Sequence, residues 1–462
     1  MSDPEKSSLH QTYAGSVDQN RLMREYPWGP SFLQTYQGMT RTTLEDLQQE
    51  RFAKVMACAW KTPFYQRLWS ESGITPHDIR DLSDLNRLPI IDKTMILADV
   101  DANPPFGSLA MRTDRPRGPA ILQTTSGTTG NPQPVIWGAW GREVQNALLG
   151  RIYGWLGVQS TDVAHSVYGH GLVNGGHYVR ESVTRYTEAM LLSAGTGIET
   201  RSDRQIAVMQ QFGATVLLGF ADYLRKLADK AVELGLEPGK DIPVRLIIGH
   251  LLAGGREPLE QAWGGAKAFN WYGVADTGAL ASEGPERDGL HLWEDANVVE
   301  ILGDEGEDSG TNPGNMVVTC LAKDDLAPLI RFNTHDVTRV LPGINAADLP
   351  FRRIDGLLGR SDNMVKLKGI NVYPSAMGGM LAEFPGFTGE YVCRWEKAGH
   401  GERLVVMCEM TDAHAADAEH IRSVLGDRLG VGIEVEVVVP GATASLTGVH
   451  ERQKPTRLVD AR

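Results

Sequence analysis

Cysteine is scarce in this chain of 462 residues, which contains only Cys58, Cys320, Cys393 and Cys408. Their wide separation forms neither a C-x-x-C pair nor a disulfide framework, so we predict buried, reduced thiols without a chemical role. Long apolar runs are also lacking, and the first twenty residues are polar, with acidic residues and no signal-like apolar core. We therefore expect a cytoplasmic protein that does not act at a membrane.

Positively charged residues are also fewer than negatively charged ones. The chain has 45 Lys and Arg residues and 58 Asp and Glu residues, which gives a formal net charge of −13. Such a chain has no global basic field for a phosphate backbone, so we do not expect it to bind nucleic acid. Hydrophobic residues make up 42% of the chain and charged residues 22%, as in ordinary folded proteins. The length predicts at least two domains.

The spacing of apolar residues predicts the architecture. The first hundred residues have a helical pattern, clearest over 43–60. After residue 119, apolar runs alternate with helical segments, which predicts an α/β fold with parallel or mixed sheets: strands at 120–122, 163–168, 215–219 and 244–248, helices at 203–211 and 221–234. A β-rich subdomain is then expected, followed by a small α+β unit: strands at 298–302, 315–321, 329–332 and 338–341, then strands at 364–368, 404–409 and 433–439 and a helix at 415–429.

The strongest local motif is the run TTSGTTGNP at 124–132, directly after the strand-like Ile121 and Leu122. Glycines let a backbone approach a ligand closely, and small hydroxyls add donors for phosphate oxygens, so the run suits a polyphosphate. It is not a Walker loop, because no Gly-Lys-Ser/Thr follows. A plain solvated turn is the alternative interpretation.

Further motifs follow this loop in a fixed order, and together they resemble the phenylacetate-CoA ligase branch of the acyl-adenylating superfamily. The resemblance runs from about Phe52 to the C-terminus and rests on these segments: WYGVADTG at 271–278, DGLHLWED at 288–295, PLIRFNTHD at 328–336, GRSDNM at 359–364, KGINVYP at 368–374 and KPTRLVD at 454–460.

The resemblance implies a large N-terminal adenylation domain over 1–358, a hinge over 359–363 centred on Asp362, and a small mobile α+β C-terminal domain over 364–462. It also implies ATP, Mg²⁺ and CoA as partners in two half-reactions. The C-terminal domain is expected to rotate between these reactions, withdrawing Lys454 and presenting an acceptor tunnel that includes Lys368 and Gly369. The family further suggests a homodimer.

Residue roles are carried over from the same resemblance. Lys454 is the expected mobile catalytic lysine, a compact cation that bridges the carboxylate and the α-phosphate, and Asp276 and Thr277 are the other expected catalytic residues. Tyr272 is expected against adenine, and Asp336 is expected to accept hydrogen bonds from the ribose hydroxyls. The full nucleotide-binding set is Thr125, Ser126, Gly127, Thr128, Thr129, Gly130, Gly255, Arg256, Glu257, Tyr272, Gly273, Asp336 and Arg360.

The expected acyl pocket has an unusual polar character. His170 and Asn174 stand where the family segment is normally more aromatic, which favours an aromatic acid that bears hydroxyl or amino groups. The alternative interpretation is that these two side chains form hydrogen bonds within the protein or point away from the pocket. The predicted pocket consists of Tyr168, His170, Gly171, Asn174, Gly175, Ala275 and Gly278.

Three departures from the family pattern concern the phosphates and metals. Asn131 replaces the usual lysine after the loop, which removes a positive charge near the leaving group. Ala275 and Asp276 replace a hydroxyl residue and a glutamate; Asp276 can still hold Mg²⁺ through oxygen, and Thr277 could take over the hydroxyl contact. The cysteines that bind zinc in some relatives are absent from 281–285, so no zinc site is expected.

Two further functions remain open at this point. Adenylation could be followed by transfer to a carrier-protein thiol, or to the hydroxyl or amine of a second small aromatic molecule, instead of to CoA. A protein of another class would bind a nucleotide or acyl-adenylate without turnover, because its phosphate-binding residues are altered.

Overall fold

The computed structural model describes residues 12–114, 117–125, 133–251, 254–303, 305–343, 345–367, 370–398, 401–411, 415–449 and 455–462. Contacts between Cα atoms divide the chain into two compact units. The first unit consists of Met1–His250, Glu260–Thr334 and Arg339–Asp355, and the second of Leu251–Leu259, His335–Thr338 and Gly356–Arg462.

The first unit begins with short helices whose starts are set by capping side chains. Asp18, Thr40 and Asp92 each accept a hydrogen bond from a backbone N–H in the first turn. The helix predicted over 43–60 is confirmed as α4. The elements are η1 (Ala14–Ser16), α2 (Gln19–Glu25), α3 (Pro30–Tyr36), α4 (Arg41–Ala59), α5 (Pro63–Glu71), η2 (Leu82–Arg87) and α6 (Lys93–Ala102).

A mixed sheet of nine described strands forms the centre of the first unit, in the order β13-β14-β9-β8-β7-β6-β5-β3-β4. The pairs from β4 to β7 are parallel and those from β7 to β13 antiparallel. The α/β prediction is thereby confirmed. The strands are β3 (Val163–Ser166), β4 (Met190–Ser193), β5 (Val216–Phe220), β6 (Leu246–His250), β7 (Lys267–Val274), β8 (Gly278–Glu283), β9 (Leu290–Leu292), β13 (Val340–Leu341) and β14 (Arg353–Ile354).

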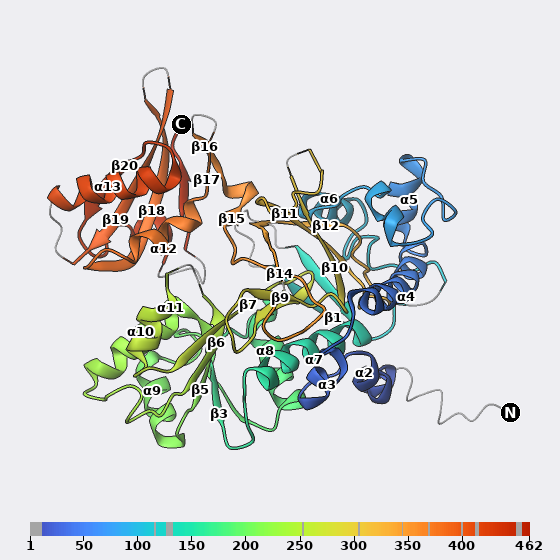
Figure 1. Cartoon of the computed structure of the whole chain (residues 1–462), viewed down its shortest axis with the longest axis horizontal. Coiled ribbons are helices and arrows are strands. Elements are labelled where there is room, and N and C mark those ends of the chain that lie inside the picture. The colour runs from blue at the N-terminus through green and yellow to red at the C-terminus, as the bar shows by residue number, and fades with distance from the viewer. Residues whose placement is uncertain are drawn as a thin grey trace. The chain divides into compact units, whose positions relative to one another are not determined.

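Helices cover both faces of the parallel strands (Figure 1). Successive strand residues point to opposite faces. Ala164 of β3 therefore packs in one core with residues of α7 and α8, whereas the next residue, His165, hydrogen-bonds Gln205 of α9 at 2.9 Å. The helices are α7 (Ala139–Trp155), α8 (Asn174–Tyr186), α9 (Ser202–Phe212) and α10 (Ala221–Glu233). A further helix, α11 (Arg256–Ala262), begins in the second unit and ends in the first.

Helix α7 is enclosed along its whole length, since every residue except Gly154 is buried. It follows a two-stranded antiparallel hairpin of β1 (Ala120–Thr124) and β2 (Pro134–Gly138), in which Thr124 pairs with Pro134. The hairpin thus brackets the polyphosphate motif, and α7 leads from it into the core.

The predicted β-rich subdomain is present, with one correction. Strands β10 (Asn297–Leu302), β11 (Gly314–Cys320) and β12 (Phe332–Thr338) are neighbours in a second sheet. The strand predicted over 329–332 is wrong, because β12 begins only at Phe332. The φ angles of Ala327 and Arg331 are 47° and 51°, which an extended strand does not allow.

The second unit has an α+β core, as predicted. Its four-stranded sheet has the order β20-β19-β18-β21, and α13 packs next to β20. The helix predicted over 415–429 is confirmed as α13. The elements are β15 (Gly359–Arg360), η3 (Ser361–Asn363), β16 (Val365–Leu367), β17 (Ile370–Val372), η4 (Pro374–Ala376), α12 (Met377–Leu381), β18 (Phe387–Ala398), β19 (Gly401–Met410), α13 (Ala415–Leu429), β20 (Glu434–Val438), α14 (Ala444–Thr447) and β21 (Leu458–Asp460).

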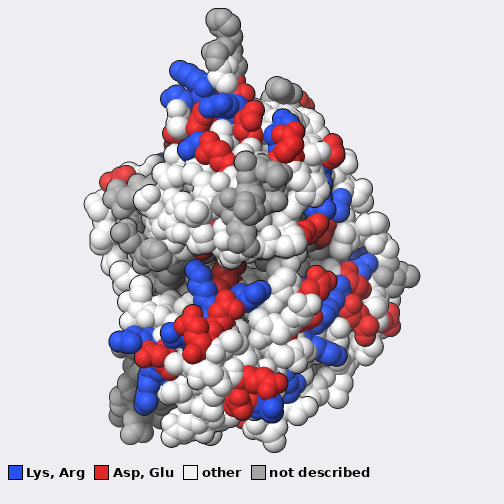
Figure 2. Space-filling model, turned by 90° about the vertical axis from the view of Figure 1, so that its left-hand side faces the viewer, with Lys and Arg blue, Asp and Glu red and all other residues white. Residues whose placement is uncertain are grey.

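The cysteine and charge predictions can be compared with the described residues. All four thiols are buried and none forms a disulfide, as expected, and burial raises the pKa of Cys320 and of Cys393 to about 12. On the face shown in Figure 2, acidic and basic side chains are interspersed and do not gather by sign. Among the described helices, none has both the length and the apolar character needed to cross a bilayer.

Candidate active site

Only the edges of the polyphosphate loop can be placed. Thr125 follows β1 directly and donates its backbone N–H to the carbonyl oxygen of Gln133 at 3.1 Å, which closes the base of the loop. The Thr125 hydroxyl is buried and has no hydrogen-bond partner within the described part of the chain. The remaining predicted loop residues, Ser126, Gly127, Thr128, Thr129 and Gly130, lie outside the described residues, as does Asn131.

The turn between β7 and β8 carries Asp276 within hydrogen-bonding distance of this loop base. The side-chain amide of Gln133 donates to Asp276 Oδ1 at 2.6 Å. Asp276 is buried, and desolvation raises its pKa although the nearby Lys323 opposes the shift. Thr277 is fully buried, with its hydroxyl 3.4 Å from the carbonyl oxygen of Gly278. A carboxylate that is costly to ionise here would gain from a cationic ligand.

Lys323 is a component of this region that the motifs did not predict. Its ammonium group lies 3.4 Å from the carbonyl oxygens of Ile136 and Asp276 and 4.1 Å from the centre of the Trp137 ring. The side chain is buried, and desolvation lowers its pKa. The only signal for it in the sequence was the position of a lysine directly after an apolar segment, which consists of β11 and the two residues that follow it. Lys323 supplies a positive charge beside the Asp276 turn.

An aromatic cluster lies where the parallel strands end. Tyr168 follows β3, Phe220 and His250 end β5 and β6, and Trp271 belongs to β7. The His250 ring stacks on Phe220 with centroids 5.0 Å apart and lies 4.4 Å from Trp271, and Tyr168 meets Phe220 edge-on at 5.2 Å. The carboxyl ends of such strands are where open α/β sheets bind ligands. The predicted pocket residue Tyr168 therefore stands beside aromatic partners.

The polar pocket residues His170 and Asn174 have partners inside the protein. His170 Nε2 is 2.8 Å from the Ser193 hydroxyl, and its backbone N–H donates to Glu199 at 3.0 Å. Asn174 Oδ1 accepts from Arg142 at 2.5 Å. Gly171 and Gly175 lie in the same stretch, Gly175 in the first turn of α8. The hydrogen-bond capacity of these two side chains is thus partly used within the fold.

Tyr272 and Gly273 lie in β7, and Ala275 and Gly278 lie in the turn and at the start of β8. Tyr272 is buried within the second apolar cluster of the first unit. Gly278 has φ of +73°, a conformation that favours glycine. The first unit therefore brings the loop base, the Asp276 turn and the aromatic cluster to the same end of its sheet.

The second unit holds a separate group of predicted residues. Asp336 of β12 pairs with Arg360 of β15, and their side chains form an ion pair at 3.1 Å. Arg360 also binds the predicted hinge residue Asp362 at 2.6 Å. Gly255 precedes α11, and Arg256 and Glu257 form its first turn. Lys368, Gly369 and Lys454 lie outside the described residues, so their roles stay predictions.

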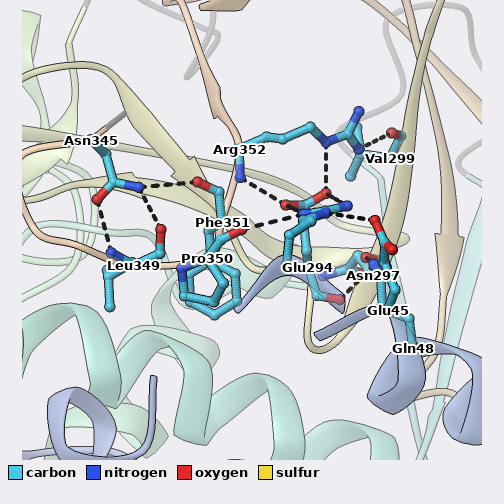
Figure 3. A network of polar contacts seen from close by, with 11 residues as sticks. Glu45, Gln48, Glu294, Asn297, Val299, Asn345, Leu349, Pro350, Phe351 and Arg352 are labelled. Atoms are coloured by element: carbon cyan, nitrogen blue, oxygen red, sulfur yellow. Dashed lines mark hydrogen bonds and ion pairs between the residues drawn. The ribbon is translucent and has the colours of Figure 1, made fainter. Parts of the chain in front are cut away.

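The acidic end of the DGLHLWED motif is structural. Glu294 is buried and binds Arg352 at 2.7 Å (Figure 3). It also binds Arg41 of α4 at 2.5 Å, which ties the N-terminal helices to the sheet. Desolvation alone would raise the pKa of Glu294, but the two arginines lower it. The neighbouring Asp295 forms a fully buried pair with Arg151 of α7 at 2.9 Å. This motif stabilises the first unit.

Known proteins resemble this chain in sequence and in fold. Residues 369–462 match the family of AMP-binding enzyme C-terminal domains. The chain is 27% identical to phenylacetate-coenzyme A ligase of Aromatoleum evansii, over 94% of this chain and 98% of the relative, and 27% identical to the Thermus thermophilus enzyme of that name, over 87% and 94%.

Among solved structures, 2-hydroxyisobutyryl-CoA ligase in a postadenylation state superposes with a TM-score of 0.80 at 23% identity, covering 92% of this chain and 91% of the other. This likeness establishes the fold: a large α/β part followed by a C-terminal AMP-binding domain. The chain is a phenylacetate-CoA ligase-like member of the adenylate-forming, AMP-binding ligase superfamily.

Proposed function

We propose that the chain is an AMP-forming acid–CoA ligase that adenylates a carboxylic acid and then passes the acyl group to CoA. The observation that carries the proposal is the buried Asp276, held by Gln133 at the base of the polyphosphate loop. We further propose that the acid is small and aromatic, with a hydroxyl or amino substituent. The aromatic cluster of Tyr168, Phe220, His250 and Trp271 supports a ring as its acyl part.

The proposed reaction has two steps, adenylation of the acid and transfer of the acyl group to CoA. A carboxylate oxygen attacks the α-phosphorus of ATP, and the bond to the β-phosphate breaks, releasing pyrophosphate. The CoA thiol then attacks the acyl carbon, and AMP leaves as the thiol proton is lost. Since both first reactants are anionic, alignment and charge neutralisation must supply most of the catalysis. We assign the neutralisation to Lys454 during the first step, and phosphate binding to the loop at 125–130.

The residues around Asp276 fit a magnesium ion. Among the described residues no group of three His, Cys, Asp or Glu side chains gathers as a metal cage. Mg²⁺ usually needs only one or two protein carboxylates, because substrate phosphates and waters complete its shell. Asp276 would hold the ion, which when bound would neutralise phosphate charge. Gln133 orients the Asp276 carboxylate through its 2.6 Å hydrogen bond.

The first experiment is ATP–pyrophosphate exchange with a panel of benzoic, hydroxybenzoic, aminobenzoic and arylacetic acids. Wild type is compared with Lys454→Ala and Asp276→Asn, and we expect exchange to fall at least about 100-fold in each, as for loss of a charge-stabilising group. Products with and without CoA are then identified by mass spectrometry. An acyl-CoA product supports the proposal. An ester, an amide or a carrier-bound product would show that the acceptor is not CoA.

Absence of exchange with every acid would overturn the proposed adenylation. If the protein then still bound ATP, the non-catalytic binding function would explain both results. Normal exchange by Lys454→Ala would remove the role proposed for that lysine.

A further inference from the structure

One face of α7 carries three buried polar side chains at helical spacing. Gln145 and Asn146 lie three and four residues after Arg142, so the three side chains project from the same side of the helix. Each is at most 1% exposed. Each also has at least one nitrogen or oxygen that finds no hydrogen-bond partner among the described residues.

Two of these side chains are nevertheless held in place. Arg142 binds Asn174 at 2.5 Å and Glu181 at 2.9 Å, and Asn146 donates to Glu181 at 3.0 Å. Gln145 differs, because both its amide nitrogen and its amide oxygen are unpaired within the described part of the chain. Its backbone is fixed, since the carbonyl oxygen accepts the Tyr178 hydroxyl at 2.7 Å.

The Gln145 amide lies directly against the turn that carries Asp276. A Cβ atom added to Gly278 would stand 2.2 Å from Gln145 Oε1, so the amide occupies the space that a side chain at 278 would fill. Tyr178 also joins the two elements, because the hydroxyl that donates to the Gln145 carbonyl oxygen accepts the backbone N–H of Ala279 at 3.2 Å. Gln145 is therefore positioned at the predicted wall of the acyl pocket, next to Gly278.

Leaving two buried polar atoms unpaired is unfavourable unless a ligand supplies their hydrogen bonds. An amide offers two donor hydrogens and an acceptor oxygen, which a single hydroxyl or neutral amino group can satisfy together. We propose that Gln145 determines specificity by hydrogen-bonding a hydroxyl or amino substituent on the acyl part of the acid. The inference rests on the proposed function, and it assigns to Gln145 the discrimination that the sequence attributed to His170 and Asn174.

The test compares Gln145→Met, which keeps the length and unbranched shape of the side chain, with wild type. Gln205→Met is the matched control, because Gln205 is equally buried but its amide is fully paired, to His165 at 2.9 Å and to the Thr200 carbonyl at 2.7 Å. For each protein, exchange kinetics are measured with acids that differ by one hydroxyl or amino group. The thermal shift produced by each acid is recorded alongside.

We expect wild type to prefer the substituted acid, and Gln145→Met to lower that preference at least about tenfold. The unliganded Gln145→Met protein should be as stable as wild type or more so, whereas Gln205→Met should be less stable with its preference intact. If Gln145→Met fails to fold, Gln145→Leu repeats the test.

An unchanged preference in a folded Gln145 variant would overturn the inference, as would an equal loss of preference in Gln205→Met. Wild type without any preference in either assay would also overturn it. If wild type shows no exchange, the proposed function fails, but the acid-dependent thermal shifts still decide whether Gln145 reads the substituent.

Discussion

Two buried polar side chains of α7, Arg151 and Gln145, differ in how their polar atoms are paired. Near its C-terminal end, Arg151 donates to both oxygens of Asp295, at 3.0 and 2.9 Å, and to the carbonyl oxygen of Pro27 at 3.0 Å. Tyr36 completes the group with a 2.7 Å hydrogen bond to Asp295. Near the N-terminal end, Gln145 is buried with neither amide atom paired among the described residues.

The difference separates a group that stabilises the fold from groups for which we propose a ligand. Desolvation alone would raise the pKa of Asp295, but Arg151, Arg51 and Tyr36 lower it. For Asp276 no comparable set of donors compensates among the described residues, and desolvation leaves its pKa raised. We infer that the paired Asp295 belongs to the architecture and that the less fully paired Asp276 belongs to the candidate site.

The largest effect expected from this comparison is that of Asp295→Ala. The substitution leaves the buried Arg151 and Arg51 without their carboxylate, which should destabilise the first unit by about 3–5 kcal/mol. Denaturation followed by tryptophan fluorescence measures the change. Glu50→Ala, which removes a solvent-exposed pair with Lys54 on α4, should cost at most about 1 kcal/mol. Equal effects of the two substitutions would contradict the distinction.

Gly278→Ala should have an intermediate effect. Its φ of +73° makes alanine unfavourable by about 1–2 kcal/mol, and the new methyl group must also displace the Gln145 amide. Gly213→Ala is the control, because Gly213 has φ of +64° and open space where the methyl group would stand. Gly278→Ala should therefore cost more than Gly213→Ala, and shortening the neighbour by Gln145→Ala should remove the excess. An excess that persists would mean that Gln145 is not the obstruction.

The smallest expected effect is the pH dependence of stability at Asp324, whose carboxylate is intermediate between the paired Asp295 and the less fully paired Asp276. Desolvation, helped by Asp325, raises its pKa to about 6, although Arg21 lies 3.5 Å away. Because the folded-state pKa is above the unfolded value, the stability that protonation supplies is lost as the pH rises through 6. Relative to wild type, Asp324→Asn should thus gain on the order of 1 kcal/mol of stability between pH 5 and pH 7.5. Parallel pH–stability curves would disprove the shift.

The sequence predicted most of the helices and strands, but few of the long-range contacts that surround the candidate site. Alternation of apolar runs and helices located β3, β5, β6, α9 and α10 to within a few residues. The strand predicted over 329–332 failed, because apolar Leu329 and Ile330 fit a strand pattern while the positive φ of Ala327 and Arg331 interrupts it. A local sequence pattern does not reveal such backbone angles. The conformation of Arg331 is held by long-range contacts of its side chain, an ion pair with Glu300 and a hydrogen bond to the Leu88 carbonyl oxygen.

The contacts that define the candidate site are long-range, and this is why spacing could not find them. Gln145 meets Gly278, and Lys323 meets the carbonyl oxygen of Asp276, only after the sheet has assembled. The family motifs predict the Asp276 turn and the loop, because the functions expected of them depend on short contiguous segments. The domain boundaries, the hinge at Asp362 and the role of Lys454 stay predictions.

The enclosure of α7 has a consequence for the dynamics of the first unit. A helix with no solvent-facing side can exchange its amide hydrogens only when the structure around it opens, so its slowest amides should report global unfolding of that unit. The edge strand β4, with Met190 exposed, should exchange through local opening. Hydrogen exchange along these two elements would then give the stability of the unit and the cost of its local fluctuations in one measurement.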